Sequence, residues 1–472
     1  MTTTSDQASS PAVMPPPGCP AHVPGAAATR LYGPDFGADS KLLYERLRDQ
    51  HGPVAPVIVP GETPAWLVLG YQEIRKVLTT PSKFASNPRN WGAVQDGQVG
   101  ADHPLAPLAM YQPMCNFEDG TAHLRLRSAV RDSLEGLELR GVRRYVERYS
   151  RRLIERFGSS GRADLVSQFA EQLPMLVLTQ LVGMPEEEGP RLVEACRDLM
   201  KGTATAVTSN EYVLNALTAL VAQKKAQPGK DLASTLLAHE SGLTDQEVVE
   251  HLRLILVGAN ETTSNLITDM LEVVLTEPRS AAQLRGGQMT LFEALDQVLW
   301  NTPPLAVLPA RYALHDTELG DQMIRSGDMV LLGLAAGNAD PAIRPDLSTS
   351  MAGNRAHLAF GAGPHGCPGG DIGRSIAETG IDELLRILPD MSLADEAAPR
   401  PRTPTWTSSH LEKLPVRFTA PKPASQAARE ELPSTAPDDA DAPAPGPGPL
   451  PEPVPYSSSW WGRLIGAFRR DH

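Results

Sequence analysis

One cysteine in a glycine-rich loop is the residue of this sequence best suited to chemistry. Cys367 lies within Phe360-Gly-Ala-Gly-Pro-His-Gly-Cys-Pro-Gly369. Glycines allow tight turns in which backbone N–H groups approach the sulfur, and a helix expected just after Cys367 points its positive end at it. Both effects stabilise a thiolate. Phe360 can pack against a flat apolar ligand, and His365 can donate to an anion beside that ligand.

Two further groups of residues have spacings that suit ligand binding or proton transfer. His123 and Arg127 are four residues apart on an expected helix, so they share a face that suits a carboxylate. Glu261 and Thr262 lie within a long apolar helical pattern, where a buried carboxylate is costly unless it is hydrogen-bonded or hydrated. Gly258 weakens that helix by about 1 kcal/mol relative to Ala, and a kink there would free carbonyls and admit water.

Helical periodicity dominates the part of the chain that must position these residues. Helices are expected at 40–51, 71–78, 244–275, 291–300 and 372–388, and arginine-rich helical spacing covers 123–157. The longest helix opens with Thr244-Asp-Gln-Glu247, which has the form of a capping box. Short strands are expected at 54–59, 65–69, 311–313, 329–334 and 414–418. The pattern predicts an α+β, predominantly helical fold with a small β subdomain.

Composition limits the class of protein. The chain has 472 residues and a formal net charge of −13, which argues against nucleic acid as the main partner because phosphate binding needs a concentrated basic surface. Its four cysteines lack metal-ligand spacing and follow no secretory signal, so we expect reduced thiols and a cytoplasmic location. No stretch reaches the roughly 20 apolar residues that span a bilayer.

Composition also divides the chain into four segments. Residues 1–30, rich in Thr, Ser, Ala and Pro, are interpreted as a disordered lead-in to a domain over 31–418. Residues 419–455 are dominated by Pro, Ala and Asp and are expected to form a disordered linker. Residues 456–472 place aromatic and aliphatic residues at helical spacing among arginines. This tail is either a basic amphipathic contact for a membrane surface or partner protein, or a frayed end without a role.

The loop around Cys367 resembles the haem-binding loop of the cytochrome P450 family. The family pattern Phe-x-x-Gly-x-x-x-Cys-x-Gly is matched by Phe360, Gly363, Cys367 and Gly369. An ordinary cysteine in an unrelated glycine-rich loop is the alternative, which is disfavoured because every fixed position is present before a helix. The resemblance implies a cytochrome P450 fold, with haem b between the long helix and this loop and Cys367 as the axial iron ligand.

The resemblance also implies a set of residues that bind the haem propionates. His123 and Arg127 match the family's His-x-x-x-Arg pair, and His365 lies where a further propionate contact is usual. Arg311 resembles the arginine that reaches a propionate from the strand after the 291–300 helix. Each residue alone could be an ordinary solvated side chain, but together with Cys367 they favour haem binding.

The middle of the long helix resembles the family's I-helix motif. Val257-Gly-Ala-Asn-Glu-Thr-Thr263 matches it except at Ala259, where Gly is usual. The resemblance implies that Thr262 holds a proton-donating water network over the haem. It further implies that Glu261 relays protons from solvent to that network.

The sequence departs from the family at the helix before Pro303-Pro304. Glu-x-x-Arg is usual there, but Gln297 and Trp300 occupy the two positions, and the meander arginine that joins this ion pair falls on Ala352. Losing one member of a buried ionic set is costly, whereas replacing the whole set by apolar or neutral groups can be neutral. We therefore expect a coordinated substitution, with packing at Trp300 supporting the loop, as in an unusual actinobacterial subgroup.

The resemblance implies a monooxygenase that inserts one oxygen atom from dioxygen into a small or medium apolar organic substrate. Electrons are expected from NAD(P)H through a separate ferredoxin and ferredoxin reductase, because the chain carries no flavin or iron–sulfur signature. The alternative is a haem-binding accessory or sensor protein with little or no turnover. The altered helix favours the alternative, whereas the presence of Glu261 and Thr262 favours the enzyme.

Overall fold

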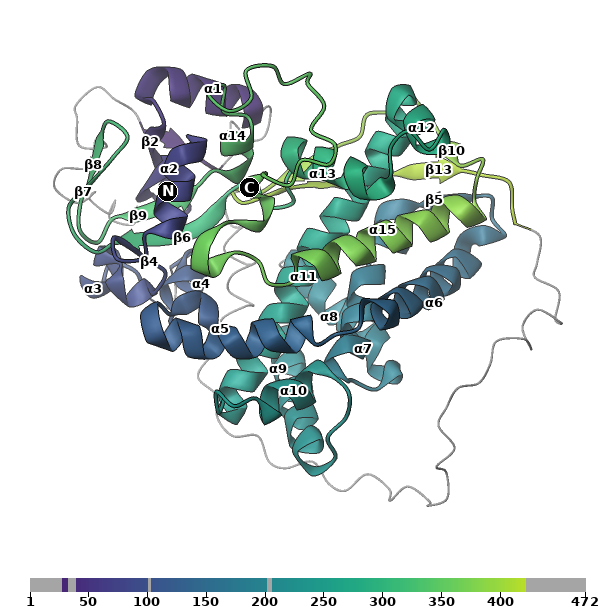
Figure 1. Cartoon of the computed structure of the whole chain (residues 1–472), viewed down its shortest axis with the longest axis horizontal. Coiled ribbons are helices and arrows are strands. Elements are labelled where there is room, and N and C mark those ends of the chain that lie inside the picture. The colour runs from purple at the N-terminus through teal and green to yellow at the C-terminus, as the bar shows by residue number, and fades with distance from the viewer. Residues whose placement is uncertain (1–27, 33–39, 101–102, 202–205, 422–472) are drawn as a thin grey trace, which may run out of the picture.

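A helical body and a smaller sheet-containing part make up the fold of the computed structural model (Figure 1). The structure describes residues 28–32, 40–100, 103–201 and 206–421. The predicted helix-dominated α+β class is confirmed. The C-terminal tail and most of the predicted lead-in and linker lie outside the described residues. At the two ends of the described part, Thr29 pairs with Val57 and the backbone N–H of Thr419 donates to Asp390.

The helices predicted at 40–51, 71–78, 244–275, 291–300 and 372–388 are present to within two residues at each end, whereas the arginine-rich stretch 123–157 forms two helices and those between 173 and 238 were not predicted. The helices are α1 (Ser40–His51), α2 (Tyr71–Thr79), α3 (Gly92–Gln95), α4 (Ala106–Ala109), α5 (Gly120–Glu135), α6 (Leu139–Gly158), α7 (Leu173–Val182), α8 (Gly189–Lys201), α9 (Ala206–Ala226), α10 (Leu232–Ala238), α11 (Asp245–Thr276), α12 (Pro278–Arg285), α13 (Leu291–Asn301), α14 (Leu334–Asn338) and α15 (Gly370–Ile387). The expected capping box is confirmed at the start of α11, where Thr244 and Glu247 bond each other's backbone N–H groups.

The strands form one larger sheet and three small ones. The larger sheet has the order β1-β2-β3-β9-β6-β4, and the others are β10-β13-β5, β11-β12 and β7-β8. Their bounds are β1 (Thr29–Arg30), β2 (Val54–Val59), β3 (Thr63–Val68), β4 (Phe84–Ala85), β5 (Arg162–Asp164), β6 (Leu308–Ala313), β7 (Thr317–Leu319), β8 (Gln322–Ile324), β9 (Met329–Leu332), β10 (Ser392–Leu393), β11 (Arg402–Pro404), β12 (Ser409–Leu411) and β13 (Pro415–Arg417).

The long helix α11 packs in the middle of the helical body and also contacts strand β12. Its apolar residues Leu266, Ile267 and Met270 are fully or almost fully buried in the helical core, into which α6, α7, α9 and α15 also pack. Figure 1 shows α15 lying alongside α6. Each fully buried side chain of this size contributes about 1.5–3 kcal/mol, so the position of α11 is set by burial along most of its length.

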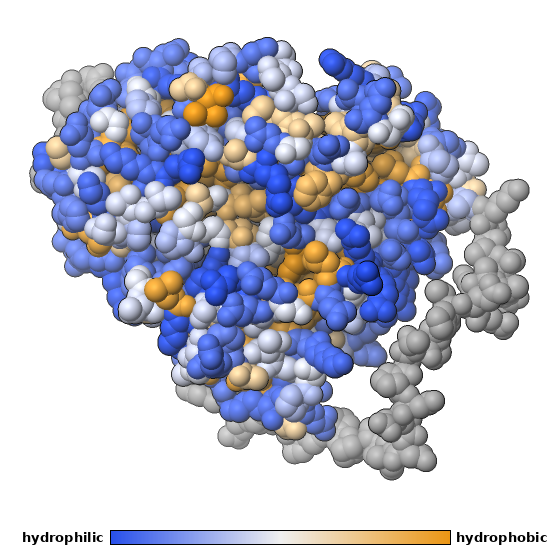
Figure 2. Space-filling model, viewed as in Figure 1, coloured by the Kyte–Doolittle hydropathy of each residue, from blue (hydrophilic) through white to orange (hydrophobic). Residues whose placement is uncertain are grey.

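The surface is mostly hydrophilic on the face shown in Figure 2, where hydrophobic side chains occur in separated groups. Exposed large apolar residues on the molecule include Leu124 on α5 and Leu139 at the start of α6. Among the described residues, no helix has both the length and the apolar character needed to cross a bilayer.

Candidate active site

The loop that carries Cys367 is closed by its own backbone. The Cys367 N–H donates to the carbonyl oxygen of Phe360 at 2.8 Å. Gly363 has φ +67°, and a Cβ there would lie 2.5 Å from the carbonyl oxygen of Leu78. Only glycine fits this contact with α2. Because α15 begins at Gly370, the cysteine is held at a fixed place just before a helix.

The thiol of Cys367 is exposed to solvent yet closely surrounded by protein. Burial raises the pKa of this thiol, although the Gly369 N–H and the positive charge of Arg127 lower it. The expected contact between a loop N–H and the sulfur is therefore present, at Gly369. A metal ion bound to the sulfur would keep it deprotonated. A Cβ on Gly369 would meet no atom within 4 Å, so the loop borders open space there.

The four basic residues singled out in the sequence form one cluster beside this loop. The rings of His123 and His365 lie 4.0 Å apart between centroids. Arg127, one turn along α5 from His123, donates to the carbonyl of Gly366 next to the cysteine. Arg311 is buried on β6, where its guanidinium donates to the Ala310 carbonyl at 2.9 Å.

The electrostatics of this cluster suit an anion. Burial and the neighbouring His365 and Arg127 charges lower the pKa of His123 to about 4. Burial also lowers the pKa of the Arg311 guanidinium. Asp119 lies 3.5 Å from His365, but His123 Nε2 is buried without a hydrogen-bond partner among the described residues. The positive charge of the cluster therefore comes from Arg127 and Arg311, and the unpartnered His123 nitrogen offers a further hydrogen bond. Together they fit a ligand that brings carboxylates, as the haem propionates would.

Helix α11 is unbroken at Glu261 and Thr262, where the sequence suggested a kink at Gly258. The Thr262 hydroxyl donates to the Gly258 carbonyl at 2.8 Å, and α11 is continuous in hydrogen bonding through this turn. The expected free carbonyl at Gly258 is therefore occupied by the side chain four residues later. This turn lies near the start of α15, because a Cβ on Gly373 would be 3.4 Å from the Thr263 hydroxyl.

Glu261 contacts two residues that sequence reasoning did not single out. Its Oε1 atom lies 3.3 Å from His410 Nε2 and 3.4 Å from Ser408 Oγ. Both partners belong to the C-terminal hairpin region, almost 150 residues away in the chain. No local pattern in the sequence marks them as part of the site.

A buried ionic network lies behind the cysteine loop. Arg374 on α15 donates through Nη2 to Asp296 on α13, and the same nitrogen lies 2.9 Å from His357 Nε2. All three side chains are buried. The Arg374 guanidinium also lies 5.4 Å from the centroid of the Phe360 ring. The two positions of the family ion pair hold the neutral residues Gln297 and Trp300, as the sequence indicated, but the neighbouring Asp296 carries a charge that is paired across helices with Arg374.

Gln297 and Trp300 also hold the segment before the loop. Gln297 Oε1 accepts from the Met351 N–H at 2.5 Å, and Trp300 Nε1 donates to the Asn354 carbonyl at 2.8 Å. The Trp300 ring stacks on Tyr71 with centroids 6.5 Å apart. The expected support from Trp300 is therefore present in the structure.

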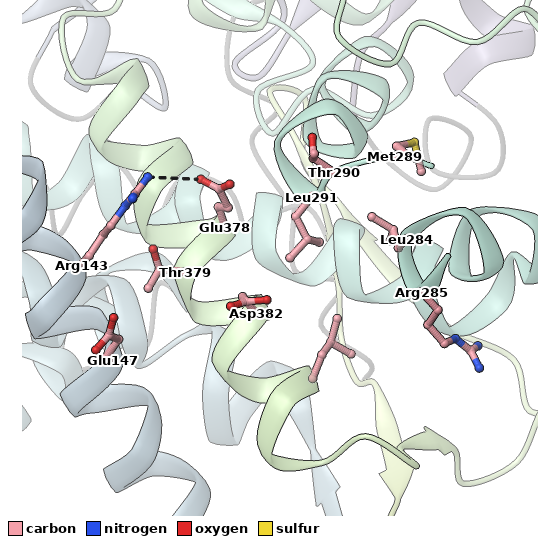
Figure 3. A pocket seen from close by; sticks show the side chains of 11 residues that line it. Arg143, Glu147, Leu284, Arg285, Met289, Thr290, Leu291, Glu378, Thr379 and Asp382 are labelled. Atoms are coloured by element: carbon pink, nitrogen blue, oxygen red, sulfur yellow. Dashed lines mark ion pairs between the residues drawn. The ribbon is translucent and has the colours of Figure 1, made fainter. Parts of the chain in front are cut away.

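A surface hollow of about 510 Å³ lies between α6, the α12–α13 connection and α15 (Figure 3). Its rim carries Arg143 and Glu378, which form a 4.0 Å ion pair across the gap. None of the candidate site residues lines it, so we do not assign this hollow to the active site.

Comparison with known proteins places these features in a family. Residues 160–406 match the model of the cytochrome P450 family. The 2-hydroxy-5-methyl-1-naphthoate 7-hydroxylase of Streptomyces carzinostaticus is 30% identical, over 76% of this chain and 90% of the relative. The cytochrome P450 monooxygenase PikC of Streptomyces venezuelae is 30% identical over 82% and 92% of the two chains. The solved structure of CYP154A1 from Streptomyces coelicolor has a TM-score of 0.72 and 29% identity, covering 81% and 98%.

Proposed function

Because this chain belongs to the cytochrome P450 family and is a monooxygenase of that family, we propose that Cys367 is its haem-iron ligand. The proposed cofactor is haem b. The proposed reaction inserts one oxygen atom from dioxygen into a small or medium apolar organic molecule. The name of the relative that hydroxylates 2-hydroxy-5-methyl-1-naphthoate supports a compact organic substrate.

The observation that carries this proposal is the basic cluster beside the cysteine loop. His123, Arg127, Arg311 and His365 come from α5, β6 and the loop, yet they converge next to Gly366 and Cys367. A buried imidazole nitrogen without a partner is costly unless a ligand supplies one. We infer that the two haem propionates bind here, while Cys367 binds the iron.

Bound haem with a thiolate ligand supplies the activation of dioxygen, since the thiolate pushes electron density toward the oxygen and favours O–O cleavage. The chain supplies the surroundings. We propose that Thr262 orients water over the haem and that Glu261 brings protons to this water. The side chain of Glu261 is 35% exposed, so protons from solvent can reach its carboxylate. Electrons would come from NAD(P)H through a ferredoxin and a ferredoxin reductase.

The cysteine assignment is tested by reducing the haem-loaded protein under carbon monoxide. The parent should give the red-shifted Soret band of a thiolate-ligated haem, and Cys367→Ser should lose it. Cys115→Ser is the matched control, because Cys115 is buried on the segment before α5 and carries no proposed role. A parent protein that binds haem without the thiolate band would contradict the proposal.

The role of Thr262 is tested by NADPH consumption with a surrogate ferredoxin and reductase and a panel of apolar compounds. Thr262→Ala should divert most consumed electrons into hydrogen peroxide, since water is no longer held for productive proton transfer. Thr276→Ala is the control, because its hydroxyl makes the same 2.8 Å bond to the carbonyl four residues earlier, near the end of α11. A parent that never consumes NADPH above background would favour haem binding without turnover.

A further inference from the structure

One face of α11 carries a row of polar side chains that pair with the β11–β12 hairpin. Glu261, Asn265 and Asp269 recur at four-residue steps, so they lie on one side of the helix. His410 on β12 reaches the first two, with Nδ1 3.1 Å from Asn265 Oδ1 and Nε2 3.3 Å from Glu261 Oε1. Arg402 on β11 reaches Asp269 at 2.6 Å.

The two pairs along this row differ in their access to solvent. The Asp269 side chain is only 6% exposed, and Arg402 also binds Glu272 at 2.7 Å, so this pair is a fixed attachment of the hairpin. The side chains of His410 and Glu261 are 29% and 35% exposed. An imidazole and a carboxylate that touch each other and also touch water can exchange protons with solvent.

The orientation of the imidazole determines which nitrogen can take part. Because Nδ1 faces the Asn265 amide, Nε2 is the nitrogen that faces the Glu261 carboxylate whichever way that amide is turned. Nε2 also lies 3.2 Å from the Ser408 hydroxyl, which lies 3.4 Å from the same Glu261 oxygen. The three side chains therefore close a small polar ring at the solvent side of Glu261.

We propose that His410 passes protons from solvent to Glu261 during turnover. The Nε2–H bond of the imidazolium breaks as an O–H bond forms on Glu261 Oε1, which leaves a neutral imidazole and a carboxylic acid. Nε2 is then protonated again by hydronium or a buffer acid in the solvent, which is left as water or the buffer base, and no electrons move. This inference rests on the proposed function, because it assumes that Glu261 delivers protons to the water near Thr262.

The groups around His410 and Glu261 show which of them can exchange a proton with the Glu261 carboxylate. In the described part of the chain, Glu261 is the charged group that contacts His410 from α11, and Ser408 and Asn265 are neutral. The next charged groups on the two elements, Asp269 and Arg402, are paired with each other. A histidine changes charge between about pH 5 and 8, so it can both donate and regain a proton under ordinary conditions.

The kinetic test uses the full-length haem-loaded protein with NADPH, surrogate ferredoxin and reductase, over about pH 5 to 8. Glu261→Gln should lower NADPH oxidation about 100-fold, and His410→Gln about 10-fold, with a flattened pH profile. Combining the two should be no worse than Glu261→Gln alone, because both act on one path. Thr403→Ala is the matched control: Thr403 pairs across the hairpin with His410, but its hydroxyl bonds Glu412 at 2.7 Å.

The outcomes separate this inference from the proposed function. If Glu261→Gln oxidises NADPH like the parent, the proposed proton role of Glu261 fails. If Glu261→Gln is slow but His410→Gln keeps the rate and pH profile of the parent, only the role of His410 is overturned. An effect of Thr403→Ala as large as that of His410→Gln would also overturn it, because the hairpin structure and not the imidazole would then be responsible.

A second measurement does not depend on turnover. NMR spectra of histidine-labelled protein are recorded, and the His410 signal is assigned by its loss in His410→Gln. In Glu261→Gln the chemical shifts of the His410 ring should change, because the carboxylate 3.3 Å from Nε2 is replaced by an amide. Identical His410 shifts in the parent and Glu261→Gln would overturn the direct contact on which the inference depends.

Discussion

Two ionic networks flank the proposed haem site, and they differ in how much water reaches them. Behind the cysteine loop, the side chains of Asp296 and Arg374 are 0% and 1% exposed. On the other side, Glu261 and His410 are about one-third exposed. Charges in a dry, densely packed setting are fixed in place, whereas charges open to water can gain and lose protons. The buried network is therefore suited to positioning the loop, and the open one to moving protons.

The buried network is held by packing as much as by hydrogen bonds. Asp296 Oδ2 and Arg374 Nη1 are buried without hydrogen-bond partners among the described residues. Such atoms cost about 1–3 kcal/mol each, so the network does not maximise stability. The guanidinium of Arg374 instead contacts two aromatic rings, 5.1 Å from the centroid of Phe292 and 5.4 Å from that of Phe360. This arrangement connects α13 and α15 to the residue whose carbonyl accepts the Cys367 N–H.

The largest expected effect comes from breaking the buried network on one side. Arg374→Met should lower the free energy of unfolding by about 3–5 kcal/mol, because the Asp296 carboxylate is left buried without its cation. Haem content and the thiolate Soret band under carbon monoxide should fall together. Arg355→Met is the control, since Arg355 forms an exposed ion pair with Asp371 near the same loop. Equal stability of the two variants would contradict a positioning role for the buried network.

The next prediction concerns how the free energy of unfolding depends on pH. The buried base His357, beside Arg374, and the buried acid Asp269, beside the hairpin, should contribute in opposite directions. Burial and Arg374 lower the pKa of His357 to about 4, so the unfolded chain binds more protons between about pH 4 and 6.5 and stability rises with pH. Burial raises the pKa of Asp269 to about 6, so the folded chain binds more protons between about pH 4 and 6 and stability falls as pH rises.

Urea unfolding of the full chain across this pH range measures both contributions. His357→Asn should remove the rise in the free energy of unfolding with pH, and Asp269→Asn should remove the fall, each on the order of 3 kcal/mol. The parent shows the sum of the two, so each variant is compared with the parent at every pH. If the difference in unfolding free energy from the parent changed with pH in the same direction for both variants, the two regions would not differ in this way.

Replacing both members of the buried pair should lower the free energy of unfolding less than replacing Arg374 alone. Asp296→Asn combined with Arg374→Met leaves no unpaired charge, so it should recover stability to within about 1–2 kcal/mol of the parent. The measurement is a double-mutant cycle from urea unfolding of the full chain. Strictly additive losses would mean that the two side chains do not interact energetically. Recovered stability without a recovered thiolate Soret band would show that the ion pair positions the loop specifically.

The smallest expected effect is at Trp300. Trp300→Phe removes the indole N–H that donates to the Asn354 carbonyl and keeps much of the ring, so it should cost about 1 kcal/mol. Trp66→Phe removes another buried indole N–H, which donates to Asp328 in the sheet. Both variants should lower the thermal midpoint, but only Trp300→Phe should shift the Soret band. A spectral shift in Trp66→Phe would mean that the loop senses general stability.

Much of the fold and site could be predicted because the relevant signals are local. The capping box at Thr244 and the apolar period behind it define α11, and the glycines around Cys367 define its loop. The pair His123 and Arg127 is visible as a four-residue spacing on a helix. These patterns depend on backbone hydrogen bonding and side-chain direction within one element, which neighbouring residues fix.

The partners across elements could not be predicted in this way. Asp296 is next to Gln297 in an apolar helix, and an acid there signals a buried partner, but Arg374 is 78 residues away. His410 meets Glu261 only because the β11–β12 hairpin packs against α11. Which charges meet, and how much water reaches them, depends on the angles at which helices and hairpins pack. The sequence by itself determined the cysteine loop, its basic residues and the long helix, whereas the tertiary structure decided which charges are sealed and which stay open.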